Sequence, residues 1–136
     1  MRSRFKSTVI IAAALFAFTP NVVDADGPTT PKGLSGNVTA TIPLEGVFKT
    51  SDGLQMRARE VTIAPGGRIP VHQHVDRPGV AYILEGEVTE HRVSEGKTVV
   101  TPAGTTVREQ IGLTHWIENT GDKPARAFVV DIVPVK

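Results

Sequence analysis

Turn residues interrupt this chain at short intervals over most of its length. Gly and Pro together make up 23 of the 136 residues, and beyond residue 25 no long stretch suited to a helix is free of both. Runs of alternating or β-branched residues lie between turn signals such as Ser51-Asp52-Gly53, Ser94-Glu95-Gly96 and Pro102-Ala103-Gly104. About ten short strands at this spacing predict an all-β fold, an antiparallel sandwich or barrel in a single domain.

The segment from residue 38 to residue 74 predicts several of these strands. We expect strands at 38–42, 46–50 and 68–74, with Pro65-Gly66-Gly67 as a turn. Apolar residues occupy even positions from 54 to 58 but odd positions at 61 and 63. One extra residue near Arg59-Glu60 would produce this change of phase, so the pattern predicts a β-bulge there. Arg57 and Arg59 alternate with the apolar residues at 54, 56 and 58, so we expect the two arginines to form a solvated face.

The first 25 residues have the layout of a secretory signal peptide. Three basic residues, Arg2, Arg4 and Lys6, precede an apolar run over residues 9–18, and Val23-Asp24-Ala25 offers small residues at a cleavage site. The apolar run is short for crossing a bilayer, and an uncleaved membrane anchor is the alternative interpretation. We therefore expect a protein exported to the periplasm or secreted.

Cleavage after Ala25 would leave 111 residues and change the formal charge from +1 to −1. Residues 26–36 have the composition of a flexible linker, which leaves 37–136 for the β domain. No stable membrane insertion is expected once the signal is removed.

Composition excludes several kinds of chemistry. The chain has no cysteine, so it has no disulfide, no thiol nucleophile and no thiolate metal site. Its 15 basic and 14 acidic residues nearly cancel, and the broad basic surface expected of a nucleic-acid-binding protein is not predicted. The sequence also has no Gly-x-Ser-x-Gly, no phosphate-binding glycine loop and no His-Glu-x-x-His.

Histidines are the residues best suited to chemistry here. His72 and His74 are separated by one residue in an expected strand, so their side chains point to the same face. Two imidazoles on the concave inner face of a barrel can converge on one metal ion. His91 lies in the polar run 87–93 and is expected at the surface. His115 precedes Trp116, which on a strand would point away from the histidine's face.

The order of these residues along the chain resembles the two motifs of the cupin superfamily. The first motif matches at Gly66, His72, His74 and Gly86, and the second at Gly96, Pro102, Gly104, His115 and Asn119. The resemblance covers roughly residues 54–133. It implies a small antiparallel β-barrel of the jelly-roll type, one divalent metal ion held inside it by His72, His74 and His115, and a homodimer. Asn119 resembles a family residue for which a structural hydrogen bond to a turn is as reasonable as a functional role.

Two departures from the family pattern affect the expected metal site. The family's glutamate ligand would fall at Gly79 or Pro78, and ten residues separate Gly104 from His115 where the family usually has two. Glu109, in this longer segment, is a candidate replacement ligand, and Asp76 is a second. Three neutral imidazoles without a carboxylate would leave the ion its full charge and open positions for water or substrate.

Two functions remain open at this point. One is a metal-dependent enzyme, an oxygenase, isomerase or lyase acting on a small organic molecule. The other is a non-catalytic module of the cell envelope that binds a metal or a small ligand. Histidine and carboxylate ligands suit Fe, Mn, Ni, Cu or Zn, and the sequence does not choose among them.

Overall fold

The computed structural model describes residues 27–135. The expected signal peptide therefore lies outside the described residues. Within residues 27–135, no helix has the length and apolar character needed to cross a membrane.

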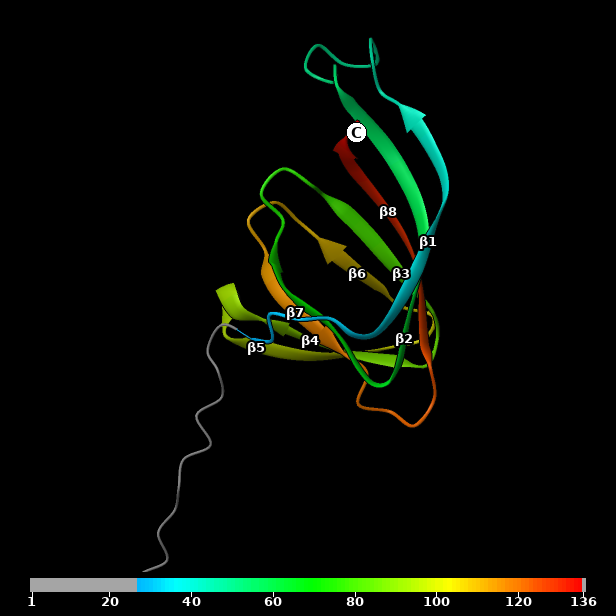
Figure 1. The fold of residues 1–136 in the computed structure, drawn as a ribbon. Helices are drawn as coiled ribbons and strands as arrows, with labels where there is room; N and C mark the ends of the chain where they lie inside the picture. The colour runs from blue at the N-terminus through cyan, green and yellow to red at the C-terminus, as the bar shows by residue number, and fades with distance from the viewer. Residues whose placement is uncertain (1–26, 136) are drawn as a thin grey trace, which may run out of the picture.

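Within the described residues, eight strands and one short 3-10 turn make up the regular structure. In chain order they are β1 (Lys32–Pro43), β2 (Leu54–Gln73), β3 (Gly79–Glu85), β4 (Glu87–Arg92), η1 (Val93–Glu95), β5 (Lys97–Pro102), β6 (Thr106–Glu109), β7 (Thr114–Glu118) and β8 (Ala125–Pro134). All neighbouring strands pair antiparallel, in the order β5-β4-β7-β2-β8-β3-β6, and β1 pairs with β2 outside this path. The strands curve into a nearly closed barrel, which confirms the predicted fold class (Figure 1).

Strand β2 is much longer than predicted, because the expected turn at Pro65-Gly66-Gly67 lies within it. Gly66 has a φ of 66°, a left-handed conformation that glycine adopts without steric cost. The first half of β2 pairs with β8 and its second half with β7, so the strand bends around a corner of the barrel. The separate strands predicted on either side of the turn are therefore one element.

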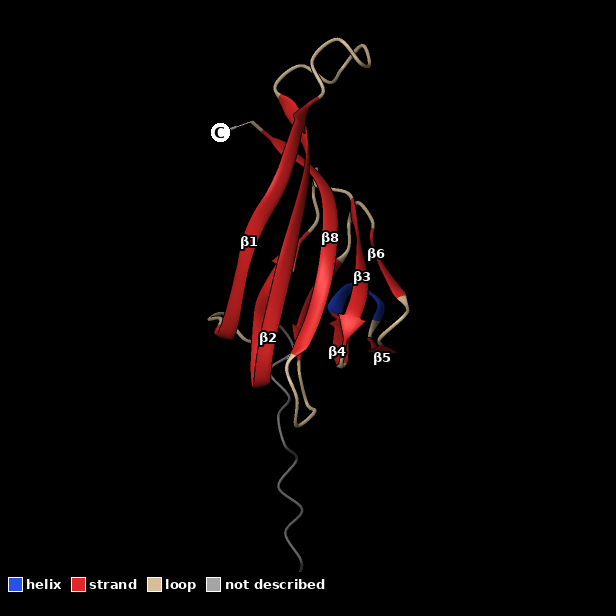
Figure 2. Cartoon of the chain, turned by 90° about the vertical axis from the view of Figure 1, so that its right-hand side faces the viewer, coloured by secondary structure: helices blue, strands red, loops and turns tan. Residues whose placement is uncertain are grey.

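The N-terminal boundary of the domain also differs from the prediction. Residues 32–36, expected in a flexible linker, are the first five residues of β1. They pair with β2 from Lys32 opposite Arg68 to Gly36 opposite Val61. Strand β1 lies at the edge of the molecule beside β2 (Figure 2). Residues 46–50, predicted as a strand, form turns instead.

The predicted bulge near Arg59-Glu60 is absent where β2 pairs with β8. That register runs without a break from Leu54 opposite Pro134 to Ile63 opposite Ala125. Arg57 and Arg59 therefore share the inward face of β2 with the buried core residue Val61. The irregularity lies in β1, between the pairs formed by Val38 and Ala40. The prediction that both arginines face solvent is wrong for this reason.

The hydrophobic core fills one part of the barrel interior. It consists of short and branched apolar side chains from six strands: Val61, Ile63, Ala81, Ile83, Val88, Val107, Ile117, Ala125 and Val129. Polar and charged side chains occupy the rest of the interior: His74, Glu90, Glu109, His115 and Asp131 are all buried. Buried charges are retained only where partners or ligands compensate them, so this half of the barrel is the place to look for a site.

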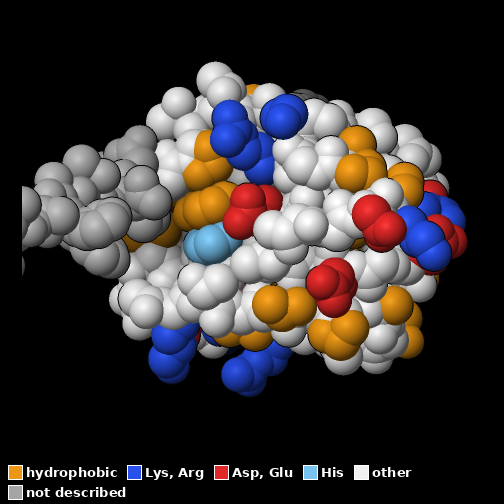
Figure 3. Space-filling view, turned by 90° about the horizontal axis from the view of Figure 1, so that it is seen from below, with side chains coloured by type: hydrophobic (Ala, Val, Ile, Leu, Met, Phe, Trp, Pro, Cys, Tyr) orange, Lys and Arg blue, Asp and Glu red, His pale blue; other side chains and the backbone are white. Residues whose placement is uncertain are grey.

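The outer surface carries charges of both signs. On the face seen from below, acidic side chains lie between groups of basic ones, with hydrophobic side chains scattered among them (Figure 3). This face therefore has no extended area of one charge.

Candidate metal centre

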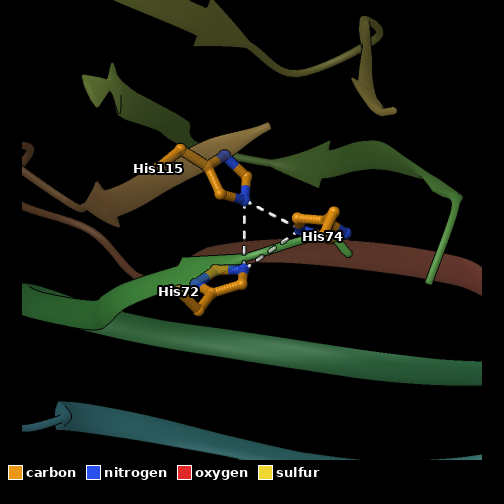
Figure 4. Close-up of side chains that lie close together, drawn as sticks. All are labelled: His72, His74 and His115. Atoms are coloured by element: carbon orange, nitrogen blue, oxygen red, sulfur yellow. Dashed lines mark hydrogen bonds between the residues drawn. The ribbon is translucent and has the colours of Figure 1, made fainter. Parts of the chain in front are cut away.

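Three histidines meet inside the barrel. His72 lies near the end of β2, His74 follows directly after that strand, and His115 lies on β7 opposite His72. Their Nε2 atoms form a small triangle with separations of 3.2 Å between His72 and His74, and of 3.0 Å from His115 to each of the others (Figure 4). The side chains that the sequence predicted to converge therefore lie together.

The outer ring nitrogen of each histidine has a partner that fixes the position of its proton. Nδ1 of His72 donates to the carbonyl oxygen of Pro70 at 2.9 Å, and Nδ1 of His74 donates to that of Arg77 at 2.8 Å. Nδ1 of His115 donates to Oε1 of Glu90 at 2.7 Å. Because a carbonyl or carboxylate oxygen only accepts, each neutral imidazole carries its proton on Nδ1 and has a lone pair on Nε2.

Three lone pairs that face one another at this distance repel unless a cation lies between them. The separations of 3.0–3.2 Å suit three nitrogens that share one ion at about 2.0–2.1 Å. Among residues 27–135, His72, His74 and His115 form a group whose potential ligand atoms all lie within 4.8 Å of one another. The donor set therefore fits a single divalent transition-metal ion.

The surroundings keep His72 in the neutral form that a ligand needs. Burial lowers its pKa, the neighbouring His115 and His74 lower it further, and the hydrogen bond to Pro70 opposes them only in part, so the pKa falls to about 4. His72 is thus unprotonated at neutral pH without any metal present.

Glu90 was not recognised from the sequence as part of the site. It lies on β4 beside His115, is completely buried, and accepts a second hydrogen bond from Nε of Arg92 at 3.0 Å. Burial acts to raise the pKa of Glu90, but the hydrogen bonds from His115 and Arg92 outweigh it and the pKa lies below its ordinary value. Glu90 is therefore a carboxylate that orients His115, an arrangement common behind metal-binding histidines. Glu90 is two residues from the apolar Val88, so on a strand both side chains point to the same face. This spacing was the one signal in the sequence that Glu90 faces the interior.

His91 lies on the outer side of the same strand pair. Its ring stacks on Trp116 with centroids 3.7 Å apart, and its Nε2 is 2.9 Å from Oε1 of Glu118. His91 and Trp116 point away from His115, as their positions on the strands predict.

A pocket of about 520 Å³ opens beside the histidines. His72 lies in its wall, together with the apolar residues Val61, Ile69 and Ile117, the charged residues Arg59, Arg77 and Glu109, and residues 34–38 of β1. Arg57, next but one to Arg59 along β2, binds Asp131 through two hydrogen bonds of 3.0 and 2.6 Å. The candidate metal centre is therefore reachable from a cavity large enough for a small organic molecule.

A comparison with protein families supports the assignment suggested by the motifs. The family described as the cupin domain matches residues 59–131. The chain belongs to the cupin family. The match spans more than half of the chain, from the inward arginine of β2 to Asp131 on β8, and so contains the whole candidate metal centre.

Curated relatives of this cupin include plant germin-like proteins. Germin-like protein 1 of Brassica napus is 33% identical over 86 residues, which are 60% of this chain and 41% of the relative. A germin-like protein of Morus alba is 29% identical over 106 residues, 71% of this chain and 51% of the relative. The cupin spans about half the length of these relatives.

Solved structures with a similar fold include an oxalate oxidase and a predicted oxalate decarboxylase. An oxalate oxidase in complex with the substrate analogue glycolate is 27% identical, with a TM-score of 0.55, over 78% of this chain and 57% of that one. A predicted oxalate decarboxylase from Thermotoga maritima is 26% identical, with a TM-score of 0.51, over 60% of this chain and 81% of that one.

Glycine replaces the expected family glutamate in this cupin, and the structure gives a local reason. Gly79 on β3 pairs with Glu109 on β6. A Cβ atom at position 79 would lie 3.0 Å from Oε2 of Glu109 and 2.9 Å from Cβ of Asp131. The side chain of Glu109 thus occupies space beside position 79, although it lies outside the group of three histidines. Asp76, the other candidate ligand, is exposed.

Asn119 has a structural role at the end of β7. Its Nδ2 donates to the carbonyl oxygens of Ile63 at 2.9 Å and Lys123 at 2.7 Å, and its Oδ1 accepts from the backbone N–H of Gly121 at 3.0 Å. These bonds tie the turn after β7 to β2. Asn119 follows His115 by four residues, so it lies at the other end of β7 from the histidine group.

Proposed function

We propose that this cupin is a metal-dependent enzyme that converts a small organic molecule bound in the pocket beside His72. The observation that carries the proposal is the convergence of three Nε2 lone pairs whose Nδ1 protons are all engaged elsewhere. Three protein ligands leave coordination positions open, as catalytic metal sites require. Oxidation and decarboxylation of a small molecule are the leading reaction classes, because an oxalate oxidase and a predicted oxalate decarboxylase are among the similar proteins.

The chain contributes positioning and environment to such a reaction. His72, His74 and His115 would hold a divalent ion as neutral imidazoles, and such an ion would supply Lewis acidity toward an oxygen atom of the bound molecule. Glu90 holds His115 in one tautomer and orientation. Ile69 and Ile117 contribute apolar surface to the wall of the pocket, against which the carbon atoms of a bound molecule can pack.

Metal analysis tests the first half of this proposal. We expect protein without a histidine tag to contain about one transition-metal ion per chain by elemental mass spectrometry. His72→Ala and His115→Ala should each lose most of that metal, because two imidazoles remain. His91→Ala is the matched control and should retain it, since His91 lies on the outer face. Equal metal content in all four proteins would overturn the proposed site.

Activity of the metal-loaded protein tests the second half. Oxygen consumption and carbon dioxide release would be followed with oxalate as the first substrate, and then with other small acids. Turnover that is lost in His72→Ala and kept in His91→Ala supports an enzyme. A protein that binds one metal ion and converts none of these acids would instead favour the non-catalytic metal-binding module.

A further inference from the structure

Two groups of opposite charge in the pocket lack hydrogen-bond partners. Among residues 27–135, three buried side-chain atoms have no partner: Nε of Arg59, Nε of Arg68 and Oε2 of Glu109. Arg59 and Glu109 line the pocket together with His72. Buried donors and acceptors are nearly always satisfied, so an unpaired donor and an unpaired acceptor in one cavity indicate that a bound molecule supplies their partners.

Arg59 is only partly neutralised by the nearest carboxylate, Asp131, with which it forms a long ion pair but no hydrogen bond. Asp131 is held by Arg57 through both of its oxygens, and the closest approach of Arg59 to Asp131 is 3.7 Å, beyond hydrogen-bond distance. Burial lowers the pKa of Arg59, and the charges of Asp131 and Glu109 counter this only in part. An arginine in this position gains most from an anion that accepts its donors directly.

Arg77 adds to the positive character of the same cavity. It lies in the pocket wall, and its guanidinium forms no ion pair within the described part of the chain. Glu60 also borders the pocket, but it pairs with Arg126. Arg59 and Arg77 therefore outnumber Glu109, so the cavity favours a molecule with net negative charge.

Glu109 adds a second requirement. Residue Glu109 exposes only 5% of its surface. Its carboxylate forms no ion pair among residues 27–135, even though Arg59 lines the same cavity. A carboxylate only accepts hydrogen bonds, so its partner must carry an O–H or N–H group. A purely anionic molecule such as acetate satisfies Arg59 but leaves Glu109 unpaired.

We propose that the pocket selects a small carboxylate that also carries a hydrogen-bond donor, with its carboxylate on Arg59 and its hydroxyl or amino group on Glu109. This selection rests on the proposed function, because it places the molecule beside the metal-binding histidines. Arg59 and Glu109 are then the specificity-determining residues of the site. A hydroxycarboxylate and an amino acid share the required chemistry, and the experiment separates them.

Binding to protein reconstituted with Zn²⁺ tests this inference without turnover. Calorimetric titrations would use glycolate, glycine, acetate and methyl glycolate, which differ in one group at a time. We expect glycolate or glycine to bind at least about tenfold more tightly than acetate, and methyl glycolate to bind most weakly, since a charge-assisted hydrogen bond is lost in each comparison. Equal binding of glycolate and acetate, or of glycolate and methyl glycolate, would overturn the inference.

Matched variants assign the two halves of the molecule to the two residues. Arg59→Met should weaken the binding of every carboxylate tested by about tenfold or more. Arg108→Met changes an exposed position next to Glu109 on β6 and should leave these affinities unchanged. Glu109→Met should remove the preference for glycolate or glycine over acetate while acetate still binds. Glu109→Gln keeps the volume and serves as a second variant if the methionine protein does not fold.

Metal content keeps this test separate from that of the proposed function. A protein without a metal ion would refute the metal centre. A protein with one Zn²⁺ per chain whose affinity for glycolate is unaffected by Arg59→Met would refute the carboxylate subsite alone.

Discussion

Nδ1 of His115 donates a hydrogen bond to Oε1 of Glu90 at 2.7 Å, and both side chains are fully buried. Arg92 binds the other oxygen of Glu90 at 3.0 Å, so the carboxylate cannot rotate away from the histidine. His72 and His74 are held by backbone carbonyls instead. His115 is therefore the member of the group whose orientation depends on a side chain, and this makes its role testable by substitution.

Glu90→Gln should weaken metal binding by about tenfold or more. The amide retains the size of the side chain but loses its charge, and it cannot accept from both His115 and Arg92. Competition with a coloured chelator measures the change in affinity. Glu118→Gln is the matched control, because Glu118 contacts His91 at 2.9 Å on the outer face of the same strands. Similar losses in both variants would refute a specific role for Glu90.

The metal-free protein should become less stable as the pH falls from 7 to 5. His72 has a folded-state pKa of about 4, below its ordinary value of 6.5, so the unfolded chain binds a proton in this window and the folded chain does not. Stability is complete above about pH 6.5 and decreases as the pH falls toward 4. We expect a loss of about 1–2 kcal/mol at pH 5, measured by thermal unfolding in the presence of a chelator.

The variant His72→Gln isolates this contribution. Glutamine does not titrate, so the unfolding temperature of the variant should change less between pH 7 and pH 5 than that of the unmodified chain. The same dependence in both proteins would show that groups other than His72 control acid stability.

The sequence predicted the three histidines and singled out Glu109, which lies in the pocket wall, but it missed Glu90 and placed Arg59 in solvent. The one-residue spacing of His72 and His74 places both on the same side of a strand, and that relation survives any error in strand ends. Arg59 was assigned to a solvated face because it alternates with the apolar residues at 54, 56 and 58, whereas the unbroken register of β2 with β8 places it on the inward face with Val61. Glu90 was missed because a charged residue in a polar run is usually exposed, and its burial depends on which strand pairs with β4.

Processing of the N-terminal segment remains a prediction. Expression of the full chain in a bacterium with a periplasm should yield a protein whose intact mass corresponds to a start at Asp26. Ala25→Arg should block this cleavage, because the residue before the cut must be small, whereas Asn21→Arg should not. Recovery of soluble protein that begins at Met1 would contradict export.

The exposed edge strand β1 indicates that two copies of the chain associate. All twelve of its residues are exposed, and Val38 and Ile42 expose 54% and 53% of their surface. A long edge strand with exposed apolar side chains is prone to pair with another chain, and the described residues contain no other element covering it. We expect a dimer by size-exclusion chromatography with light scattering, in agreement with the homodimer implied by the family resemblance.

Ile42→Asp should shift this dimer toward monomer, because a charge would be buried between the copies. Val100→Asp is the control, since Val100 is 57% exposed but lies on β5 at the far end of the strand order. A monomer at all concentrations, or equal effects of the two substitutions, would refute association through β1.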